Sequence, residues 1–211
     1  RSAGAREVLA IVADATDDAS VAAAFLTVGD AWDAVNVLVN AVGPSTVGRF
    51  EVLDDEAWHA AFEDGVMSAV HCIRHCLPLL RRAPWARIVN MTALSTKHQS
   101  PVMIAYTAAK SALASVTKNL ARTLAPEGIL VNAVAPGPVL TDSVRQLVMR
   151  SGGDPDKPAD IDRVMSERWN IDLGRVGLPS EVAEAVVFCA SPRNTYMTGA
   201  HLNVDGGSDF C

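Results

Sequence analysis

Short apolar segments alternate with longer amphipathic ones along most of this chain, and this alternation limits the folds open to it. Each apolar segment has the length and aliphatic character of a buried strand. The expected strands are Val8–Ala13, Val35–Asn40, Arg87–Met91, Leu130–Ala135 and His201–Val204. The expected helices are Asp17–Asp30, a long helix from Asp54 or Asp55 to about Arg82, Val102–Ala125 and Pro179–Cys189. Strands and helices that alternate in this way predict an α/β fold with a doubly wound parallel sheet.

The composition agrees with one such domain over residues 1–211. Hydrophobic residues make up 49% of the chain and aromatic residues only 5%, so the expected core is aliphatic. A chain of 211 residues is long enough to bury a substantial single core. Ligands of open parallel sheets bind beyond the carboxyl ends of the strands, so we look for functional residues directly after each strand.

Charge and hydropathy exclude several classes of function. The formal net charge of −6 argues against a nucleic-acid partner and against a basic membrane-binding surface. No apolar run reaches the roughly 18 residues that a membrane span needs, and Arg1 opens no secretion signal. The four cysteines lack C-x-x-C spacing and suit a reducing compartment. These features predict a cytoplasmic protein that binds neither membrane nor nucleic acid.

One cluster of residues raises the question of a metal site. His71, Cys72, His75 and Cys76 recur along one stretch of the second expected helix, and both residue types bind zinc. Free cysteines, however, are among the residue types most often buried in protein cores. We therefore interpret these cysteines as part of a packed helix face and expect no metal site.

A tyrosine and a lysine stand one helical turn apart in the third expected helix. Tyr106 and Lys110 occupy positions i and i+4, which share a helix face. A nearby ammonium favours the phenolate, so we expect Lys110 to lower the pKa of Tyr106 from its ordinary value of about 10. A tyrosine tuned in this way can exchange a proton with a carbinol or carbonyl oxygen.

Five sequence markers, in order, give the chain a resemblance to the short-chain dehydrogenase/reductase superfamily over essentially its whole length. The markers are Asp14 after the first strand, Asn40-Ala41-Val42-Gly43, Tyr106 with Lys110, Pro136-Gly137-Pro138-Val139-Leu140-Thr141, and Thr198-Gly199 with Asp205-Gly206-Gly207. The resemblance implies a Rossmann-like fold. It also implies hydride transfer between NAD or NADP and an alcohol or carbonyl, with the cofactor carrying the hydride.

The same resemblance assigns roles to individual residues. Tyr106 is the expected acid/base, and Lys110 the residue that lowers its pKa and binds the nicotinamide ribose. The expected cofactor-binding residues are Asp14, Asn40, Ala41, Gly43, Tyr106, Lys110, Pro136, Gly137, Val139 and Thr141.

Three of these residues also have structural interpretations that the sequence leaves open. Asp14 could cap the helix that follows it, and Asn40 could tie strand ends together. Thr141 could be the N-cap of a helix over Asp142–Met149.

Two positions depart from the family pattern within the site. Ala93 stands where the family has a catalytic serine, thirteen residues before the tyrosine. Ser95 shares strand parity with Ala93 and is the expected substitute if the segment stays extended, whereas Thr92 should point to the opposite face. Gly65 stands where the family has an asparagine that holds a relay water.

A third departure concerns the beginning of the chain. No Gly-rich phosphate loop of the G-x-G-x-x-G kind occurs in it, and by resemblance the opening strand–loop–helix–strand unit is missing. The preference between NAD and NADP is therefore not readable from this sequence.

The segment 142–176 takes the position of the family's substrate lid. Its apolar residues suggest a small apolar alcohol or carbonyl substrate: Val144, Leu147, Val148, Met149, Met165, Trp169 and Ile171. The alternative is that these side chains only pack onto the domain. By analogy the long helices pair between subunits, so a homodimer or homotetramer is expected.

Three functions remain in competition on the sequence alone. The leading one is an NAD(P)-dependent dehydrogenase or reductase. Ala93 and Gly65 favour instead a non-catalytic ligand- or partner-binding descendant of the fold. A cofactor-free lyase or isomerase that uses Tyr106 and Lys110 has no positive feature in its support.

Overall fold

Four parallel strands form the single sheet of the computed structural model, which describes residues 5–210. The strands are β1 (Val37–Asn40), β2 (Ala86–Met91), β3 (Ile129–Pro136) and β4 (His201–Val204). They stand side by side in chain order, with Val39 opposite Val89 and Val89 opposite Asn132. The expected parallel α/β sheet is confirmed, and four of the five expected strands are present.

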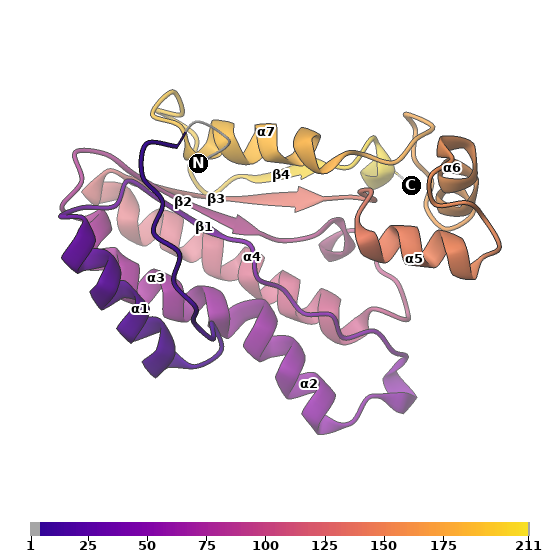
Figure 1. Cartoon of the computed structure of the whole chain (residues 1–211), viewed down its shortest axis with the longest axis horizontal. Coiled ribbons are helices and arrows are strands. Elements are labelled where there is room, and N and C mark those ends of the chain that lie inside the picture. The colour runs from indigo at the N-terminus through magenta and orange to yellow at the C-terminus, as the bar shows by residue number, and fades with distance from the viewer. Residues whose placement is uncertain (1–4, 211) are drawn as a thin grey trace.

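The helices cover both faces of this sheet. They are α1 (Asp18–Ala31), α2 (Asp55–Phe62), α3 (Ser68–Leu80), α4 (Ile104–Leu124), α5 (Asp142–Arg150), α6 (Pro158–Ser166) and α7 (Pro179–Ala190). Figure 1 shows α3 and α4 along one face and α7 along the other, while α5 and α6 lie together beyond the end of the sheet. No helix in residues 5–210 is long and apolar enough to cross a membrane.

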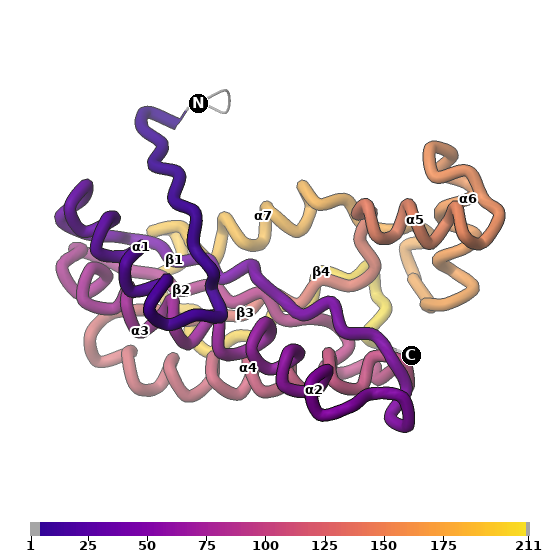
Figure 2. The backbone as a smooth tube through the Cα atoms, turned by 60° about the horizontal axis from the view of Figure 1, so that its bottom comes forward, coloured from indigo at the N-terminus to yellow at the C-terminus, as the bar shows by residue number. Residues whose placement is uncertain are grey.

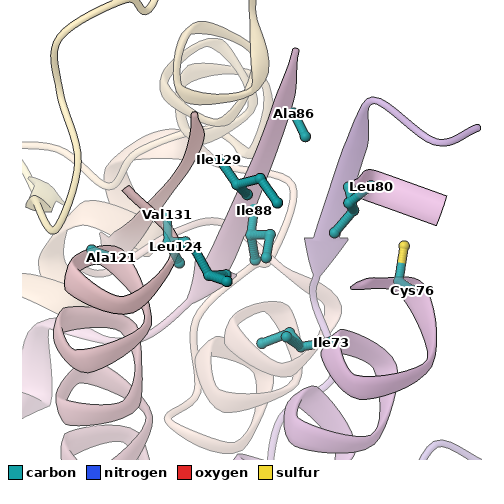
Figure 3. Packing of buried hydrophobic residues seen from close by; sticks show 9 residues of the cluster. All are labelled: Ile73, Cys76, Leu80, Ala86, Ile88, Ala121, Leu124, Ile129 and Val131. Carbon is teal, nitrogen blue, oxygen red and sulfur yellow. The ribbon is translucent and has the colours of Figure 1, made fainter. Parts of the chain in front are cut away.

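The core divides between the two faces because successive strand residues point to opposite sides. Ile88 packs with Leu80 and Leu124 on the side of α3 and α4, as Figure 3 shows. Val89, the next residue of β2, packs instead with Val182 of α7. This alternation explains why the central strands read as continuous apolar runs.

The expected strand Val8–Ala13 is not formed, and that prediction was wrong. Val8 is 56% exposed and Val12 is fully exposed, and residues 5–13 make no backbone hydrogen bond to a strand of the described chain. In Figure 2 this segment rises away from the body of the molecule. An apolar stretch becomes a strand only where a neighbour supplies hydrogen bonds, and β1 has β2 as its neighbour in the sheet.

The expected long helix from Asp54 or Asp55 to Arg82 is interrupted. Asp54 caps its start by accepting a hydrogen bond from the Ala57 N–H at 2.9 Å. A π-helical turn then replaces the α-helix over Glu63–Met67, between α2 and α3. Such turns insert one extra residue and commonly mark functional positions. Gly65, a residue of interest from the sequence, lies inside this turn.

Candidate functional site

A cavity of about 590 Å³ opens at the carboxyl ends of the strands, where the fold predicts a ligand site. Its walls come from loops that follow three successive strands, from the start of α4 and from the 142–176 segment. Pro44 and Ser45 follow β1, Ala93 and Ser95 follow β2, and the turn 136–139 ends β3. Tyr106 enters from α4.

Tyr106 lines this cavity, and Lys110 lies one turn further along α4, with only 3% of its surface exposed. The Lys110 ammonium donates hydrogen bonds to the Met91 carbonyl at 2.8 Å and to the Val42 carbonyl at 3.4 Å. Burial lowers the pKa of Lys110 to about 8, because the charged form loses solvation. The i, i+4 spacing therefore puts Tyr106 and Lys110 on the same side of α4, as the sequence predicts.

The expected effect on the tyrosine pKa is absent in this structure. Burial raises the pKa of Tyr106 above its ordinary value, because the phenolate is harder to solvate than the phenol. The ammonium of Lys110 is committed to backbone carbonyls of Met91 and Val42. The prediction that Lys110 lowers the pKa of Tyr106 is thus not met, and burial is the physical reason.

Gly43 leaves room for the head of Lys110. A Cβ atom on Gly43 would lie 2.7 Å from Lys110 Nζ and 3.1 Å from its Cε. A real Cβ cannot approach so closely without displacing its neighbour. The glycine of the Asn40-Ala41-Val42-Gly43 marker therefore has a packing reason in this chain.

Ser95 reaches the cavity, although not in the way the sequence argument assumed. Ala93 is extended, but Leu94–Thr96 form a short 3₁₀ helix, so the parity argument does not apply beyond Ala93. Ser95 still lines the cavity and is only 3% exposed. Its Oγ has no hydrogen-bond partner among the described residues, which is uncommon for a buried hydroxyl. A ligand oxygen in the cavity would satisfy it.

Thr92 is engaged by the protein itself. Its hydroxyl donates to the Val134 carbonyl at 3.1 Å and lies 2.7 Å from Nε2 of His201 on β4. Of the two hydroxyls that the sequence offered near Ala93, only that of Ser95 is unpartnered.

Gly65 is buried where the π-helical turn meets α4. A Cβ at Gly65 would lie 2.8 Å from the Ala109 Cβ and 3.2 Å from the Pro44 Cδ. Ala109 directly precedes Lys110, and Pro44 lines the cavity. The absence of a side chain at Gly65 thus allows the π-helical turn to pack closely against the part of α4 that carries Lys110.

Three expected cofactor-binding residues at the end of β1, Asn40, Ala41 and Gly43, do not line the cavity. Asn40 is buried, and its Nδ2 donates to Oδ1 of Asn90 at 2.8 Å; the Asn90 amide in turn donates to Thr117. This bridge gives Asn40 the structural role that the sequence left open. Ala41 and Gly43 are exposed in the following loop.

Asp14 lies outside the cavity walls and forms a local turn. It accepts hydrogen bonds from the N–H and the hydroxyl of Thr16 at 2.9 and 2.7 Å, which lower its pKa. Asp17, not Asp14, is the N-cap of α1. The structure therefore does not bring Asp14 together with Tyr106.

The turn after β3 contributes Pro136, Gly137 and Val139 to the cavity wall. A Cβ at Gly137 would lie 2.7 Å from the Cα of Asp205, so only glycine fits against the Asp205-Gly206-Gly207 turn. This contact therefore gives one packing reason for two sequence markers, the turn 136–141 and the turn 205–207.

Thr141 both lines the cavity and caps α5, since its hydroxyl accepts a hydrogen bond from the Val144 N–H at 3.4 Å. The helix predicted over Asp142–Met149 is confirmed as α5. Sequence reasoning left the rest of this segment irregular and missed α6, although Pro158 at its first position is a helix-start signal.

The 142–176 segment is divided between the cavity and a small core of its own. Val144, Leu147, Met165 and Trp169 line the cavity. Val148 is fully buried in the core of the segment and Met149 is 53% exposed, so neither faces the cavity, and Ile171 packs on the same small core. The packing interpretation therefore holds for Val148 and Ile171, while a contact of the four cavity-lining side chains with an apolar substrate stays a prediction.

The His71–Cys76 stretch makes no metal-like cluster within residues 5–210. The His75 Nε2 lies 3.0 Å from Asp18, whose carboxylate also accepts a hydrogen bond from Arg74. Burial raises the pKa of Cys76 to about 12, so its thiol stays protonated.

Several cavity residues were missed by the sequence reasoning. They are Pro44, Ser45, Val47, Leu94, Met103, Pro138 and Ser143. Their position just after a strand, or beside a named marker, was the available signal.

Comparison with known proteins places this site in a family. The sequence model of the family described as "Enoyl-(Acyl carrier protein) reductase" matches residues 1–209. The short-chain reductase protein NovJ of Streptomyces niveus is 34% identical over 98% of this chain and 76% of its own length. The cis-4-hydroxycyclohexanecarboxylate dehydrogenase of Sinomonas cyclohexanicum is 36% identical over 98% of this chain and 78% of its own length.

Among solved structures, the NADPH-bound short-chain oxidoreductase from Pseudomonas aeruginosa PAO1 "containing an atypical catalytic center" is similar with a TM-score of 0.87. The identity is 31%, over 94% of this chain and 75% of that one. Fold, site and relatives together define an α/β oxidoreductase that uses NAD or NADP. The chain belongs to the short-chain dehydrogenase/reductase superfamily.

Proposed function

We propose that this chain interconverts an alcohol and a carbonyl, with Tyr106 as the acid/base and Lys110 assisting it. The observation that carries the proposal is the shared cavity of Tyr106 and Ser95, the latter with an unpartnered buried hydroxyl. Lys110 stands one helical turn behind the tyrosine. A small oxygen-bearing ligand would meet both hydroxyls in this cavity.

We propose that the same cavity takes the nicotinamide of the cofactor. The turn 136–139 lies at its wall, and the absence of a side chain at Gly137 lets this turn pack against Asp205. When bound, the nicotinamide supplies or accepts the hydride. The chain's residues proposed to hold the cofactor are Asp14, Asn40, Ala41, Gly43, Tyr106, Lys110, Pro136, Gly137, Val139 and Thr141.

In this proposal two side chains act on the reacting oxygen, and Lys110 supports one of them. Tyr106 donates its proton to a carbonyl oxygen during reduction and takes it back during oxidation. The Ser95 hydroxyl donates a hydrogen bond to the same oxygen and stabilises developing negative charge there. Lys110, charged below about pH 8, assists by position: its ammonium donates to the Met91 carbonyl and holds the part of α4 that carries Tyr106.

We propose further that residues 1–211 act as one domain whose 142–176 segment is the substrate lid. The four lid side chains Val144, Leu147, Met165 and Trp169 would then cover an apolar substrate. We also propose that the protein is a homodimer or homotetramer, which light scattering on the purified protein tests directly.

The test of catalysis uses the two tyrosines of the chain as a matched pair. Tyr106→Phe should lower turnover of NADPH or NADP with a ketone and alcohol panel by about 10²–10⁴-fold, while cofactor affinity stays nearly unchanged. Tyr196→Phe, at a fully exposed position, controls for loss of a phenol. Equal turnover in wild type and Tyr106→Phe removes Tyr106 from the mechanism.

A second candidate is a ligand- or partner-binding protein with impaired catalysis. Ala93 and Gly65, which take the place of two side chains of the family's active site, favour it. The same experiment separates the two: tight NADPH binding with no turnover over the whole panel supports the binding protein.

A further inference from the structure

Within residues 5–210, the cavity wall carries no charged side chain. Among the described residues that line it there is no aspartate, glutamate, lysine, arginine or histidine. Apart from the indole N–H of Trp169, the polar side-chain groups among these lining residues are hydroxyls: Ser45, Thr92, Ser95, Tyr106, Thr141 and Ser143. Hydroxyls can hydrogen-bond a neutral oxygen, but they do not balance the charge of a buried anion.

Three basic side chains of the surrounding segments, Lys97, Arg145 and Lys110, are engaged elsewhere. Lys97 Nζ lies 2.8 Å from Asp209 Oδ2, and Arg145 Nη1 lies 2.9 Å from Asp156 Oδ1. Lys110, the cation nearest to Tyr106 along α4, donates to the Met91 carbonyl and is not part of the wall. None of these three is therefore free to receive an anionic group of a substrate.

One side of the cavity is a hydrocarbon surface from the lid. Val144 and Leu147 come from α5, Met165 from α6, and Trp169 follows α6. The Trp169 ring packs against the His98 ring, with centroids 5.7 Å apart and planes tilted by 53°. This contact joins the lid to the loop after β2 and gives the cavity a firm aromatic wall, suited to the body of an apolar substrate.

We propose that the part of the substrate that enters this cavity is uncharged, a neutral ketone or secondary alcohol with a hydrocarbon body, and that the cavity rejects carboxylates and phosphates. The inference rests on the proposed function and narrows it to a substrate class. It separates this chain from its 36%-identical relative, whose name states a carboxylate substrate.

The physical reason is the cost of burying an unpaired anion. A carboxylate that enters an apolar site without a cation loses its hydration and gains no compensating ion pair. We expect a carboxylate to bind about 100-fold more weakly than a neutral group of the same shape, a difference of about 2.7 kcal/mol.

The experiment compares ligands that share a cyclohexanone ring and differ in whether one substituent is charged. 4-Oxocyclohexanecarboxylate, its carboxamide and its methyl ester are titrated calorimetrically into the NADPH-loaded protein at neutral pH. The inference expects the amide and the ester to bind at least ~10-fold more tightly than the carboxylate. Carboxylate binding as tight as that of the neutral pair overturns it, and so does the absence of measurable binding by the neutral pair.

A charge placed on the cavity wall supplies the converse test. Leu147→Lys should reverse the preference and favour the carboxylate, because the new ammonium faces the cavity. Met149→Lys, on the same helix but 53% exposed and outside the wall, is the matched control and should keep the neutral preference. Reversal in both variants, or in neither, contradicts the inference.

Binding and turnover report separately on the two proposals. Tyr106→Phe should retain the preference for neutral ligands while losing turnover. If wild type binds the neutral ketones preferentially but never reduces them, the catalytic proposal fails and the charge inference stands. If wild type reduces the carboxylate as fast as the amide, the catalytic proposal stands and the charge inference fails.

Discussion

The Lys110 ammonium donates a hydrogen bond to the Met91 carbonyl across 2.8 Å and so ties α4 to the last residue of β2. The lysine is almost wholly buried, and its aliphatic chain runs beneath the loop that contains Gly43. A charge that is buried with only backbone carbonyls as partners is costly to keep. That cost makes stability depend on pH in a way that can be assigned to one residue.

Lys110 should make the folded state relatively more stable as pH rises above about 8. Its pKa falls from an ordinary 10.5 to about 8 in the folded protein. Below about pH 8 both states carry the charge and the full burial cost is present. Between about pH 8 and 10.5 the folded state has released the proton and the unfolded state has not, so the cost disappears. The gain is on the order of 3 kcal/mol at most.

The measurement is denaturant unfolding of wild type and Lys110→Met between pH 7 and 10. The stability of wild type relative to the variant should rise with pH over that range. Lys118→Met removes an exposed lysine from the same helix and corrects for the change in net charge. A difference between wild type and Lys110→Met that stays constant from pH 7 to 10 would contradict the assigned cost.

Gly43→Ala should impair catalysis more than stability. The added Cβ would lie 2.7 Å from Lys110 Nζ, the movable end of a side chain, so the lysine head shifts and the fold remains. We expect kcat to fall at least tenfold, with an altered pH profile and a loss of stability of about 1 kcal/mol or less. Gly29 lies inside α1, and a Cβ there would be 3.6 Å from its nearest neighbour, the Leu79 Cδ2, which is an ordinary contact. Gly29→Ala should therefore stabilise the helix and leave kcat unchanged. A pH profile of Gly43→Ala identical to that of wild type would count against this role.

Much of this site could be predicted because its information is local. The i, i+4 spacing placed Tyr106 and Lys110 on one side of α4, and the continuous apolar runs gave the parallel strands. The Pro136–Thr141 turn was also placed correctly at a strand end, since the end of a buried strand is visible in the pattern.

The missed features depend on contacts between distant segments. Val8–Ala13 has the composition of a strand, but strand formation needs a partner that local pattern does not reveal. The pKa of Tyr106 is raised by burial of its side chain, and the Lys110 ammonium donates to the Met91 carbonyl. Both depend on how α4 packs against the sheet. The π-helical turn at Gly65 packs against Ala109 of α4, a contact that no helical periodicity encodes.

Ser95→Ala and Thr92→Val should give opposite patterns of effect. Ser95 Oγ is buried without a protein partner, so its removal should leave the free energy of unfolding unchanged or raise it by about 1 kcal/mol. As the proposed donor to the reacting oxygen, its loss should lower kcat/KM by about 10²–10³-fold. Thr92→Val breaks the contacts to Val134 and His201 and should cost about 1–3 kcal/mol of stability.

Thermal unfolding and steady-state kinetics on the two variants check this pattern. Each variant is the control for the other, since both hydroxyls lie near Ala93 but only that of Thr92 forms hydrogen bonds within the described chain. Ser95→Ala with wild-type kcat/KM would show that Tyr106 polarises the carbonyl without Ser95.

Gly65 should be intolerant of any side chain, and the intolerance should depend on Ala109. A Cβ at position 65 would lie 2.8 Å from the Ala109 Cβ, an atom that cannot rotate away, so the π-helical turn and α4 must separate. Gly65→Ala should therefore destabilise the protein by about 1–3 kcal/mol and lower kcat, because the displaced segment of α4 carries Lys110.

Ala109→Gly alone should cost about 1 kcal/mol through helix propensity. In the double variant position 109 has no Cβ, so the new methyl group has room. The loss of unfolding free energy should then be smaller than the sum of the two single losses by about 0.5–3 kcal/mol. Denaturant unfolding of the four proteins measures this coupling. Strict additivity would mean that the π-helical turn absorbs the added methyl group by itself, and that its contact with α4 does not position the lysine.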